Sequence, residues 1–365
     1  MKKKSGNKRQ RVVKMDVNIR KLRDSTAYWM KKDGPLSHII ISSRIRLARN
    51  IKNIPFPFRA TDEQLLTVIE KVEKILKENK EFYGFQIIKL DNLSPVEIEF
   101  LVEKRLISFT LARFSKPYRG ILYNTDETMS IMINEEDHFR LQSMLPGFQL
   151  KKVWEIINYY DDKIEKEIKY AFNEKEGFLT CCPTNAGTGL RASVMLHLPG
   201  LIISNKISES INTIIKQGYA VRGFYGEGTE FQGNLFQISN QVTLGLSEED
   251  IINRLEISIK QLIEKEQKAR EKLIIQAKHK IEDQVMRSYG ILTNAKIITT
   301  AEALNLLSYV RFGIEMGIIA RIGYDVINRL MLIVQPGYLQ LIKGQNMKKM
   351  QRDTVRAELI KEILD

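Results

Sequence analysis

Two arginines in the segment IIISSRIRLARN, residues 39–50, could bind a highly charged anion. Arg44 and Arg46 stand two residues apart among strand-forming residues, so on a strand both side chains project from the same face. Two cations on one face require a counter-charge, and a polyphosphate supplies it in a single ligand. The alternative is a pair of solvent-facing arginines on an edge strand.

The stretch CCPTNAGTGLRASVMLHLP, residues 181–199, places another arginine beside a glycine-rich turn. Gly187 and Gly189 flank Thr188, and such a turn lets the backbone approach a ligand and present its N–H groups. Arg191 follows, and its forked guanidinium can hold two phosphate oxygens at once. The alternative is a turn between two strands that carries a surface arginine.

Carboxylates cluster in the segment NEEDHFR, residues 134–140, where a predicted strand ends. Glu135, Glu136 and Asp137 are consecutive, and they repel one another unless a cation lies among them. Because they lie beside arginines that could bind phosphate, such as Arg140, these acids would bind a cationic substrate. The alternative is that the acids lie in the first turn of a helix, where they complement its dipole, and this would account for two of the three.

A glycine-rich segment, residues 218–246, contains Arg222 and Glu227. Its spacing matches neither the Rossmann fingerprint nor the Walker loop, which requires a lysine after the last glycine. A mobile lid over a bound substrate is one interpretation, and a plain glycine-rich hairpin is the other.

Most of the net charge of +13 lies at the start of the chain. Residues 1–23 hold ten lysines and arginines against Asp16, so we expect a basic, disordered tail over residues 1–24 that contacts nucleic acid weakly at most. No apolar run is long enough to span a membrane, and no secretory signal is present. Two adjacent cysteines indicate a reducing, cytoplasmic setting, and four scattered histidines give no zinc site.

Helical and strand patterns divide the chain into two parts. A helix is predicted over residues 61–81, capped by Thr61, and another begins at Ser94. Strands are expected over residues 39–50 and 85–92, and a hairpin over 121–134. From Ser247 onward the pattern is helical. The predicted fold is therefore α+β, an antiparallel sheet flanked by helices over residues 25–260, followed by an all-helical domain over residues 261–365.

The last predicted helix carries an unusual arginine pair. Arg352 and Arg356 share one helix face, and like charges at this spacing destabilise a helix unless an anion binds them. A surface helix on which Asp353 and Glu358 screen the charge is the alternative.

Three patches together resemble the ATP:guanidino phosphotransferase family, to which creatine and arginine kinases belong. They are SSRIRLARN, NEEDHFR, and CPTNAGTGLRAS followed by RGFYGEGTEFQGNLFQISN, in one order over about residues 37–250. The resemblance implies that Glu136, Glu227 and Cys182 are catalytic. It also implies an ATP site made of Ser43, Arg44, Arg46, Arg140, Arg191, Arg222, Asn185, Gly187 and Thr188. No carboxylate cage is evident, so Mg²⁺ would be held by phosphates and water.

Within that family the chain is most similar to the branch that phosphorylates arginine residues in proteins. Arg352, Asp353 and Arg356 match the RDxxRA motif with which this branch binds phosphoarginine as an allosteric signal. The resemblance further implies a stress and quality-control role in which modified proteins go to a Clp-type ATPase and protease. It also implies a zinc-containing activator protein and a homodimer built through the C-terminal domain. Met195 stands where metabolite kinases have a nucleotide-contacting histidine, so adenine recognition should differ.

Two other functions remain open at this point. A kinase for free arginine would share the same site. A non-catalytic phosphoarginine-binding adaptor would keep the C-terminal motif but would not need Glu136 or Glu227.

Overall fold

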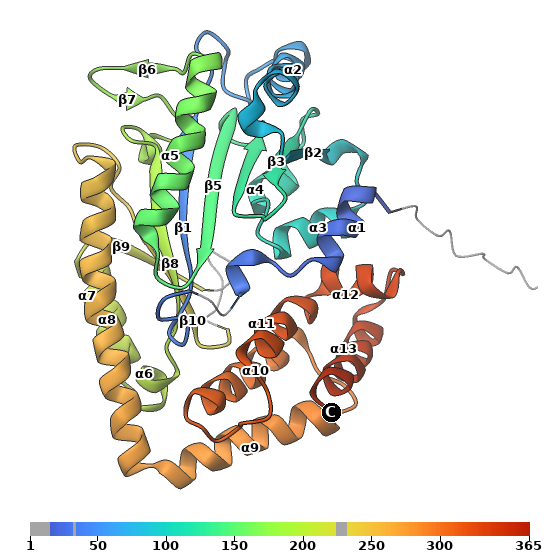
Figure 1. Ribbon diagram of the computed structural model, residues 1–365, viewed down its shortest axis with the longest axis vertical. Coiled ribbons are helices and arrows are strands. Elements are labelled where there is room, and N and C mark those ends of the chain that lie inside the picture. Colours follow the sequence, from blue (N-terminus) through green and yellow to red (C-terminus); the bar gives the residue numbers. More distant parts are fainter. Residues whose placement is uncertain (1–14, 32–33, 224–231) are drawn as a thin grey trace, which may run out of the picture.

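The computed structural model describes residues 15–31, 34–223 and 232–365 and is built on one antiparallel sheet (Figure 1). The strand order is β2-β3-β4-β5-β1-β8-β10-β9. The strands are β1 (Ile40–Arg49), β2 (Phe85–Lys89), β3 (Gly120–Asn124), β4 (Met129–Ile133), β5 (Phe139–Pro146), β8 (Leu190–His197), β9 (Tyr219–Arg222) and β10 (Leu235–Asn240). A separate two-stranded ribbon pairs β6 (Phe172–Asn173) with β7 (Gly177–Phe178). The predicted antiparallel sheet and the β3–β4 hairpin are confirmed.

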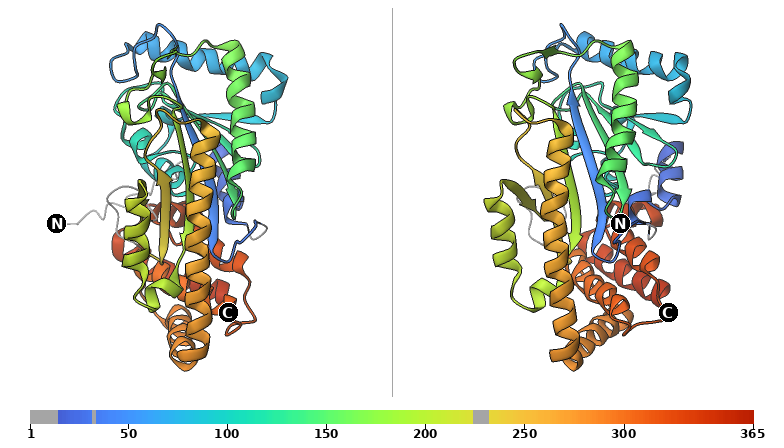
Figure 2. Two further views of the ribbon diagram at one scale, coloured as in Figure 1. Left: turned by 90° about the vertical axis from the view of Figure 1, so that its left-hand side faces the viewer. Right: turned by 60° about the vertical axis from the view of Figure 1, so that its left-hand side comes forward.

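Two long helices cover one face of this sheet (Figure 2). Helix α5 (Leu150–Glu167) packs on β1 and β5, and α8 (Glu248–Gln276) packs on β8 and β10. Alternate residues of the strands enter this core, for example Ile45 and Leu47 of β1 and Val194 of β8, all fully buried. Because side chains alternate along a strand, the residues between them face the opposite side. That second face carries Arg44 and Arg46 and remains available for a ligand.

The remaining helices of this part of the chain differ in length and lie around the sheet. They are α1 (Val17–Asp24), α2 (Asp62–Glu78), α3 (Pro95–Glu103), α4 (Phe109–Arg113), α6 (Pro199–Ile203) and α7 (Ile207–Lys216). The predicted caps are confirmed, since Thr61 and Gln64 form a capping box at α2, as do Ser94 and Glu97 at α3. Residues 1–14 of the expected basic tail lie outside the described residues. The expectation of disorder is wrong for its last part, which forms α1 because Ile19 and Leu22 have apolar partners to pack against.

The C-terminal region is helical throughout, as predicted. It contains α9 (Lys278–Asn294), α10 (Thr300–Glu315), α11 (Tyr324–Ile333), α12 (Pro336–Lys343) and α13 (Lys349–Leu364). Helix α8 runs without interruption across position 261, where the sequence placed a boundary. The helical region also shares one apolar core with the N-terminal segment and with β10, in which Trp29 and Leu235 join Leu304 and Val310.

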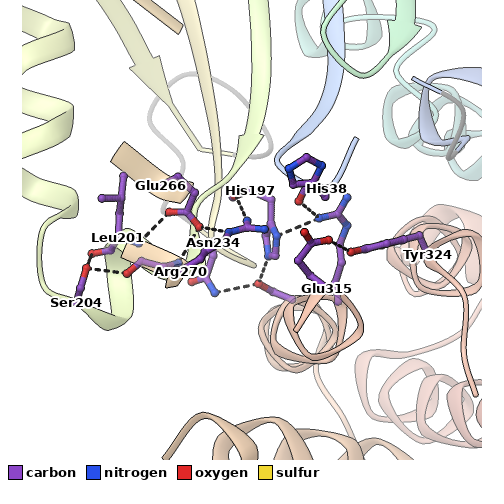
Figure 3. A network of polar contacts seen from close by, with 12 residues as sticks. His38, His197, Leu201, Ser204, Asn234, Glu266, Arg270, Glu315 and Tyr324 are labelled. Atoms are coloured by element: carbon purple, nitrogen blue, oxygen red, sulfur yellow. Dashed lines mark hydrogen bonds and ion pairs between the residues drawn. The ribbon is translucent and has the colours of Figure 1, made fainter. Parts of the chain in front are cut away.

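A buried polar network joins the sheet to α10 (Figure 3). Arg311 donates to Nδ1 of His197 over 3.1 Å, and Nε2 of His197 lies 2.7 Å from Oγ of Ser308. Burial, together with the charges of Arg311 and Arg270, lowers the pKa of His197 well below its ordinary value. A neutral imidazole that accepts at Nδ1 and donates at Nε2 satisfies both contacts. The helical region is therefore fixed to the end of β8 by directional bonds.

Candidate active site

A cavity of about 820 Å³ opens on the arginine-bearing face of the sheet. Within the described part of the chain, Glu136 is the only carboxylate that lines it. Seven guanidinium groups of the described residues line the same cavity: Arg44, Arg46, Arg105, Arg113, Arg140, Arg191 and Arg222. This excess of positive charge suits a ligand that carries several negative charges, such as a nucleoside triphosphate.

The register of three strands brings the central arginines together. Arg46 of β1 is paired with Arg191 of β8 and with Gln142 of β5. Arg44, two residues earlier, projects from the same face and is paired with Ser193. The prediction that Arg44 and Arg46 share a face is confirmed. β1 is not an edge strand, however, since it lies between β5 and β8 in the middle of the sheet.

These arginines lie close enough together to disfavour their own charge. Burial and the neighbouring guanidinium of Arg105 lower the pKa of Arg44 to about 9. Burial and Arg44 lower the pKa of Arg46 well below its ordinary value. Nε of Arg46 is also buried and has no hydrogen-bond partner among the described residues. Bound phosphates would neutralise this charge and provide the missing acceptor, so the arginines fit ATP.

The acidic cluster separates into two buried acids and one that faces the cavity. Glu135 is fully buried, lies 2.5 Å from Arg140 and accepts from the hydroxyl of Ser108. Asp137 accepts from Nδ2 of Asn50 at 2.7 Å and from the backbone N–H of Cys181 at 2.8 Å. Both acids therefore have a structural role, because their hydrogen bonds fix neighbouring residues of the site in place. They lie in the β4–β5 turn, so the alternative of a helix start is wrong.

Of these three acids, Glu136 is the one whose side chain lines the cavity and is available for catalysis. Partial burial and the adjacent carboxylate of Asp137 raise its pKa above the ordinary value. A carboxylate with a raised pKa in a cavity is a suitable proton acceptor. Its position among the arginines would allow it to orient a cationic group next to a bound phosphate.

The two cysteines differ in their surroundings. Cys182 lines the cavity, and its Sγ lies 3.0 Å from the hydroxyl of Thr184. Cys181 does not line it, and burial together with Asp137 raises the pKa of its thiol to about 11. Of the two thiols, Cys182 is the one placed to meet a substrate.

Some residues expected at the ATP site have other tasks in the structure. Asn185 lines the cavity, but Ser43, Gly187 and Thr188 do not. Ser43 faces the opposite side of β1, where its hydroxyl donates to the carbonyl of Gly147. Gly187 has a φ of 98° and lies so close to the Thr243 carbonyl that a Cβ would be 2.4 Å from that oxygen. The hydroxyl of Thr188 donates to the same carbonyl over 3.2 Å.

Glu227, the second acid expected in catalysis, lies outside the described residues. Arg222, which precedes that segment, lines the cavity from β9. The sequence did not indicate Arg105, Gln142 and Gln237, which also line it. The alternation within β5 and β10 could have pointed to the two glutamines. Arg105 gives no such signal, because it follows a helix end.

The C-terminal motif lies away from the cavity on α13. Arg356 is 1% exposed and donates to the carbonyls of Val334 and Ile298 at 2.7 and 2.8 Å. Its guanidinium also lies 2.5 Å from Asp353. Arg352 donates to the carbonyl of Met347 and remains partly exposed. The helix therefore buries one arginine of the pair with its own counter-charge.

Among the described residues, no helix is long and apolar enough to cross a membrane. That part of the chain also has no cluster of three or more histidine, cysteine, aspartate or glutamate side chains placed to hold a metal ion.

Comparison with known proteins relates both halves of the chain to one group of kinases. Residues 67–269 match the family described as ATP:guanido phosphotransferase, C-terminal catalytic domain. Residues 278–365 match the protein-arginine kinase McsB C-terminal domain. The protein-arginine kinase of Bacillus velezensis is 47% identical over 345 residues, which cover 94% of each chain. That of Moorella thermoacetica is 47% identical over 353 residues, covering 96% of this chain and 99% of the relative.

Solved structures share the fold of the catalytic part. Lombricine kinase matches with a TM-score of 0.57 and 28% identity, covering 66% of this chain and 70% of that chain. The duplicated taurocyamine kinase of Schistosoma mansoni, with bound transition-state analogue components, also gives 0.57 and 28%. That match covers 64% of this chain and 33% of the larger protein.

Proposed function

This chain belongs to the ATP:guanido phosphotransferase family, and we propose that it transfers the γ-phosphoryl group of ATP to arginine side chains in proteins. The observation that carries this proposal is the cavity in which, among the described residues, seven arginines and the carboxylate of Glu136 form the lining. The protein-arginine kinases similar to this chain share nearly its whole length, including the helical C-terminal region. They therefore favour a protein substrate over a free amino acid.

Each group in the cavity has a definite task in this reaction. The arginines hold the phosphates and neutralise the charge that develops on the transferred group. A nitrogen of the acceptor guanidinium forms a bond to the γ-phosphorus as the bond from that phosphorus to the β–γ bridging oxygen breaks. The guanidinium loses one proton, which Glu136 accepts. Because a guanidinium has a pKa above about 12, it is a poor nucleophile unless a carboxylate orients and deprotonates it. Glu227 would be the second acid that binds the acceptor guanidinium, and Cys182 would lie beside this group.

Magnesium is the metal this chemistry requires. In this proposal the phosphates and water would hold it, and it would supply positive charge that offsets the negative charge of the transferred group. The arginines then complete the positive shell around the remaining oxygens.

The C-terminal motif supports a regulatory role under the same proposal. Arg352 is the partly exposed member of the motif, while Asp353 and Arg356 are buried and paired with each other. A phosphoarginine on another protein would meet Arg352 first and would compete with Asp353 for Arg356. A homodimer through this region, a zinc-containing activator, and delivery of modified proteins to a Clp-type protease in the cytoplasm belong to the same proposal.

The test is phosphate transfer from Mg-ATP to an unfolded, arginine-rich protein, with free arginine in a parallel reaction. Acid-labile phosphate on the protein supports the proposal, since a phosphorus–nitrogen bond hydrolyses in acid. Label on free arginine alone would make the chain a kinase for the free amino acid. Binding of phosphoarginine peptides without any transfer would favour the adaptor.

A further inference from the structure

Helix α10 of the C-terminal region contacts the ends of three strands at one edge of the sheet. Because β1 and β10 both run antiparallel to β8, the start of β1, the end of β8 and the start of β10 lie side by side. Arg311 of α10 donates to the carbonyls of Ser37 and His38, just before β1, at 2.5 and 3.0 Å. The hydroxyl of Ser308 meets His197 at the end of β8. The helical region therefore supports strands whose side chains line the cavity.

The contact with β10 is made at the turn from which that strand begins. Oδ1 of Asn305, one helical turn before Ser308, accepts from the backbone N–H of Gly233 at 2.7 Å. Nδ2 of Asn234 donates to the hydroxyl of Ser308 at 2.9 Å (Figure 3). A Cβ at Gly233 would lie 3.1 Å from the carbonyl oxygen of Leu304. The turn therefore lies directly against the helix.

The backbone of this turn needs such support. Gly233 and Asn234 have φ values of 64° and 54°, so two left-handed residues follow one another. Asparagine tolerates this conformation better than most residues but still adopts it at a cost in free energy. A local conformation of this kind persists when surrounding contacts hold it. The hydrogen bond from Asn305 is one of those contacts, so the geometry with which the chain enters β10 depends on α10.

A short length of β10 joins this turn to the cavity. The strand starts at Leu235, and Gln237, two residues or about 7 Å further, lines the cavity. Gln237 is paired with Arg222 of β9, which lines the cavity as well. Every residue of β10 is buried, so the strand has little room to bend on its own. A displacement of the turn would therefore move Gln237 and Arg222 together.

The support on which the turn lies is itself fixed. Just before α10, the N–H of Ile298 donates to the carbonyl of Asp353 at 3.1 Å. The carbonyl of Ile298 accepts from Arg356 at 2.8 Å. Thr299 and Glu302 then form a capping box that starts the helix. Because α10 is held at its start, it presents Asn305 to the turn in a preorganised position.

We propose that Asn305 is a positioning residue for the nucleotide. Through the N–H of Gly233 it sets the entry of β10, and β10 in turn sets where Gln237 and Arg222 lie. Asn305 does not line the cavity, so its effect reaches the ligand only through the strand. The inference rests on the proposed use of ATP. It makes the helical C-terminal region a part of the machinery that binds the nucleotide.

The test measures binding of AMP-PNP, a non-hydrolysable ATP analogue, to the full chain by calorimetry in the presence of Mg²⁺. In Asn305→Ala the Kd should rise about fivefold or more, because the N–H of Gly233 loses its acceptor and the turn relaxes. Asn305 is exposed, so the fold tolerates this change. Asn305→Asp keeps an acceptor oxygen at the same place and should restore the wild-type Kd. Asn212→Ala, also exposed but on α7, is the matched control and should leave the Kd unchanged.

Calorimetry separates positioning from a loss of stability. Unfolded molecules in the sample lower the number of binding sites per chain but leave the Kd of the folded molecules as it was. An unchanged Kd in Asn305→Ala, with or without a lower number of sites, would overturn the proposal. A weakened Kd that Asn305→Asp does not restore would overturn it as well.

Failure of the proposed function would look different. A wild type that bound AMP-PNP but transferred no phosphate from ATP to protein or to free arginine would contradict the proposed activity. The comparison of Kd values would still decide the role of Asn305 in that case. A wild type that bound no AMP-PNP would contradict both.

Discussion

Arg140, at the start of β5, forms an ion pair at 2.5 Å with Glu135, which lies in the turn that presents Glu136 to the cavity. Glu135 is fully buried, and its second oxygen accepts from Ser108. This pair neutralises the charge of Arg140 before any ligand binds. Adjacent glutamates thus have opposite tasks, because one supports an arginine and the other faces the substrate.

Glu135→Gln should lower the stability of the free protein by about 3 kcal/mol, because a buried guanidinium loses its counter-charge. Bound ATP supplies negative charge to Arg140, so the variant should gain more thermal stability from ATP than the wild type does. Thermal unfolding with and without Mg-ATP measures both effects. An equal ATP-induced shift in the two proteins would contradict this role.

Arg49 shows that an arginine in the first motif can be purely structural. It is 2% exposed, pairs with Asp161 at 2.7 Å and stacks on Phe178 at 3.5 Å. Asp161→Ala should destabilise the fold by about 3–5 kcal/mol, since it leaves this charge buried and unpaired. Urea unfolding measures the loss. Asp162→Ala, one residue along α5 and exposed, is the matched control and should change stability by less than about 0.5 kcal/mol.

The buried His138 predicts a loss of stability in acid. Its Nδ1 accepts from the N–H of Ile51 at 3.1 Å, and burial lowers its pKa from 6.5 to about 4. Between about pH 6.5 and pH 4, the imidazole of His138 is therefore protonated in the unfolded chain but neutral in the folded protein. The contribution of His138 is therefore complete above pH 6.5 and is lost as the pH falls, by about 2 kcal/mol at pH 5.

Unfolding of the wild type and of His138→Gln at pH 7 and pH 5 isolates this effect from other titrating groups. The variant should be less stable at both pH values but should lose less stability than the wild type on acidification. The same pH dependence in both proteins would rule out His138 as the source.

Gly337 couples the C-terminal region to α3. A Cβ at this position would lie 2.8 Å from the backbone nitrogen of Phe100 and 3.0 Å from Oε2 of Glu103. Gly337→Ala should therefore push α12 away from α3 and destabilise the protein by about 1–3 kcal/mol. In Gly290→Ala, on α9, the new methyl group would meet nothing within 4 Å, and the change should be neutral or stabilising. Equal melting temperatures for the two variants would contradict a tight α3–α12 contact.

Sequence reasoning located the sheet, its hairpin and most of the cavity, because alternation and capping are local signals. Arg44 and Arg46 could be placed on one face from their spacing alone. The family resemblance singled out Glu136, but the residue pattern by itself could not separate Glu135 from Glu136, since that difference depends on the contacts of Glu135 with Arg140 and Ser108. It also assigned Ser43, Gly187 and Thr188 to the ligand, whereas their neighbours in space are Gly147 and Thr243. Arg105 was missed because helix ends do not reveal where the next side chain points.

The most direct test of the proposed chemistry is the rate of transfer by Glu136→Gln at saturating Mg-ATP and a fixed concentration of unfolded, arginine-rich protein. Glutamine keeps the shape of the side chain but cannot accept the proton. We expect acid-labile phosphate on arginine with the wild type. With the variant we expect a rate at least about 100-fold lower and ATP affinity no weaker than that of the wild type. Transfer by the variant at the wild-type rate would contradict the assignment of Glu136 as the catalytic carboxylate.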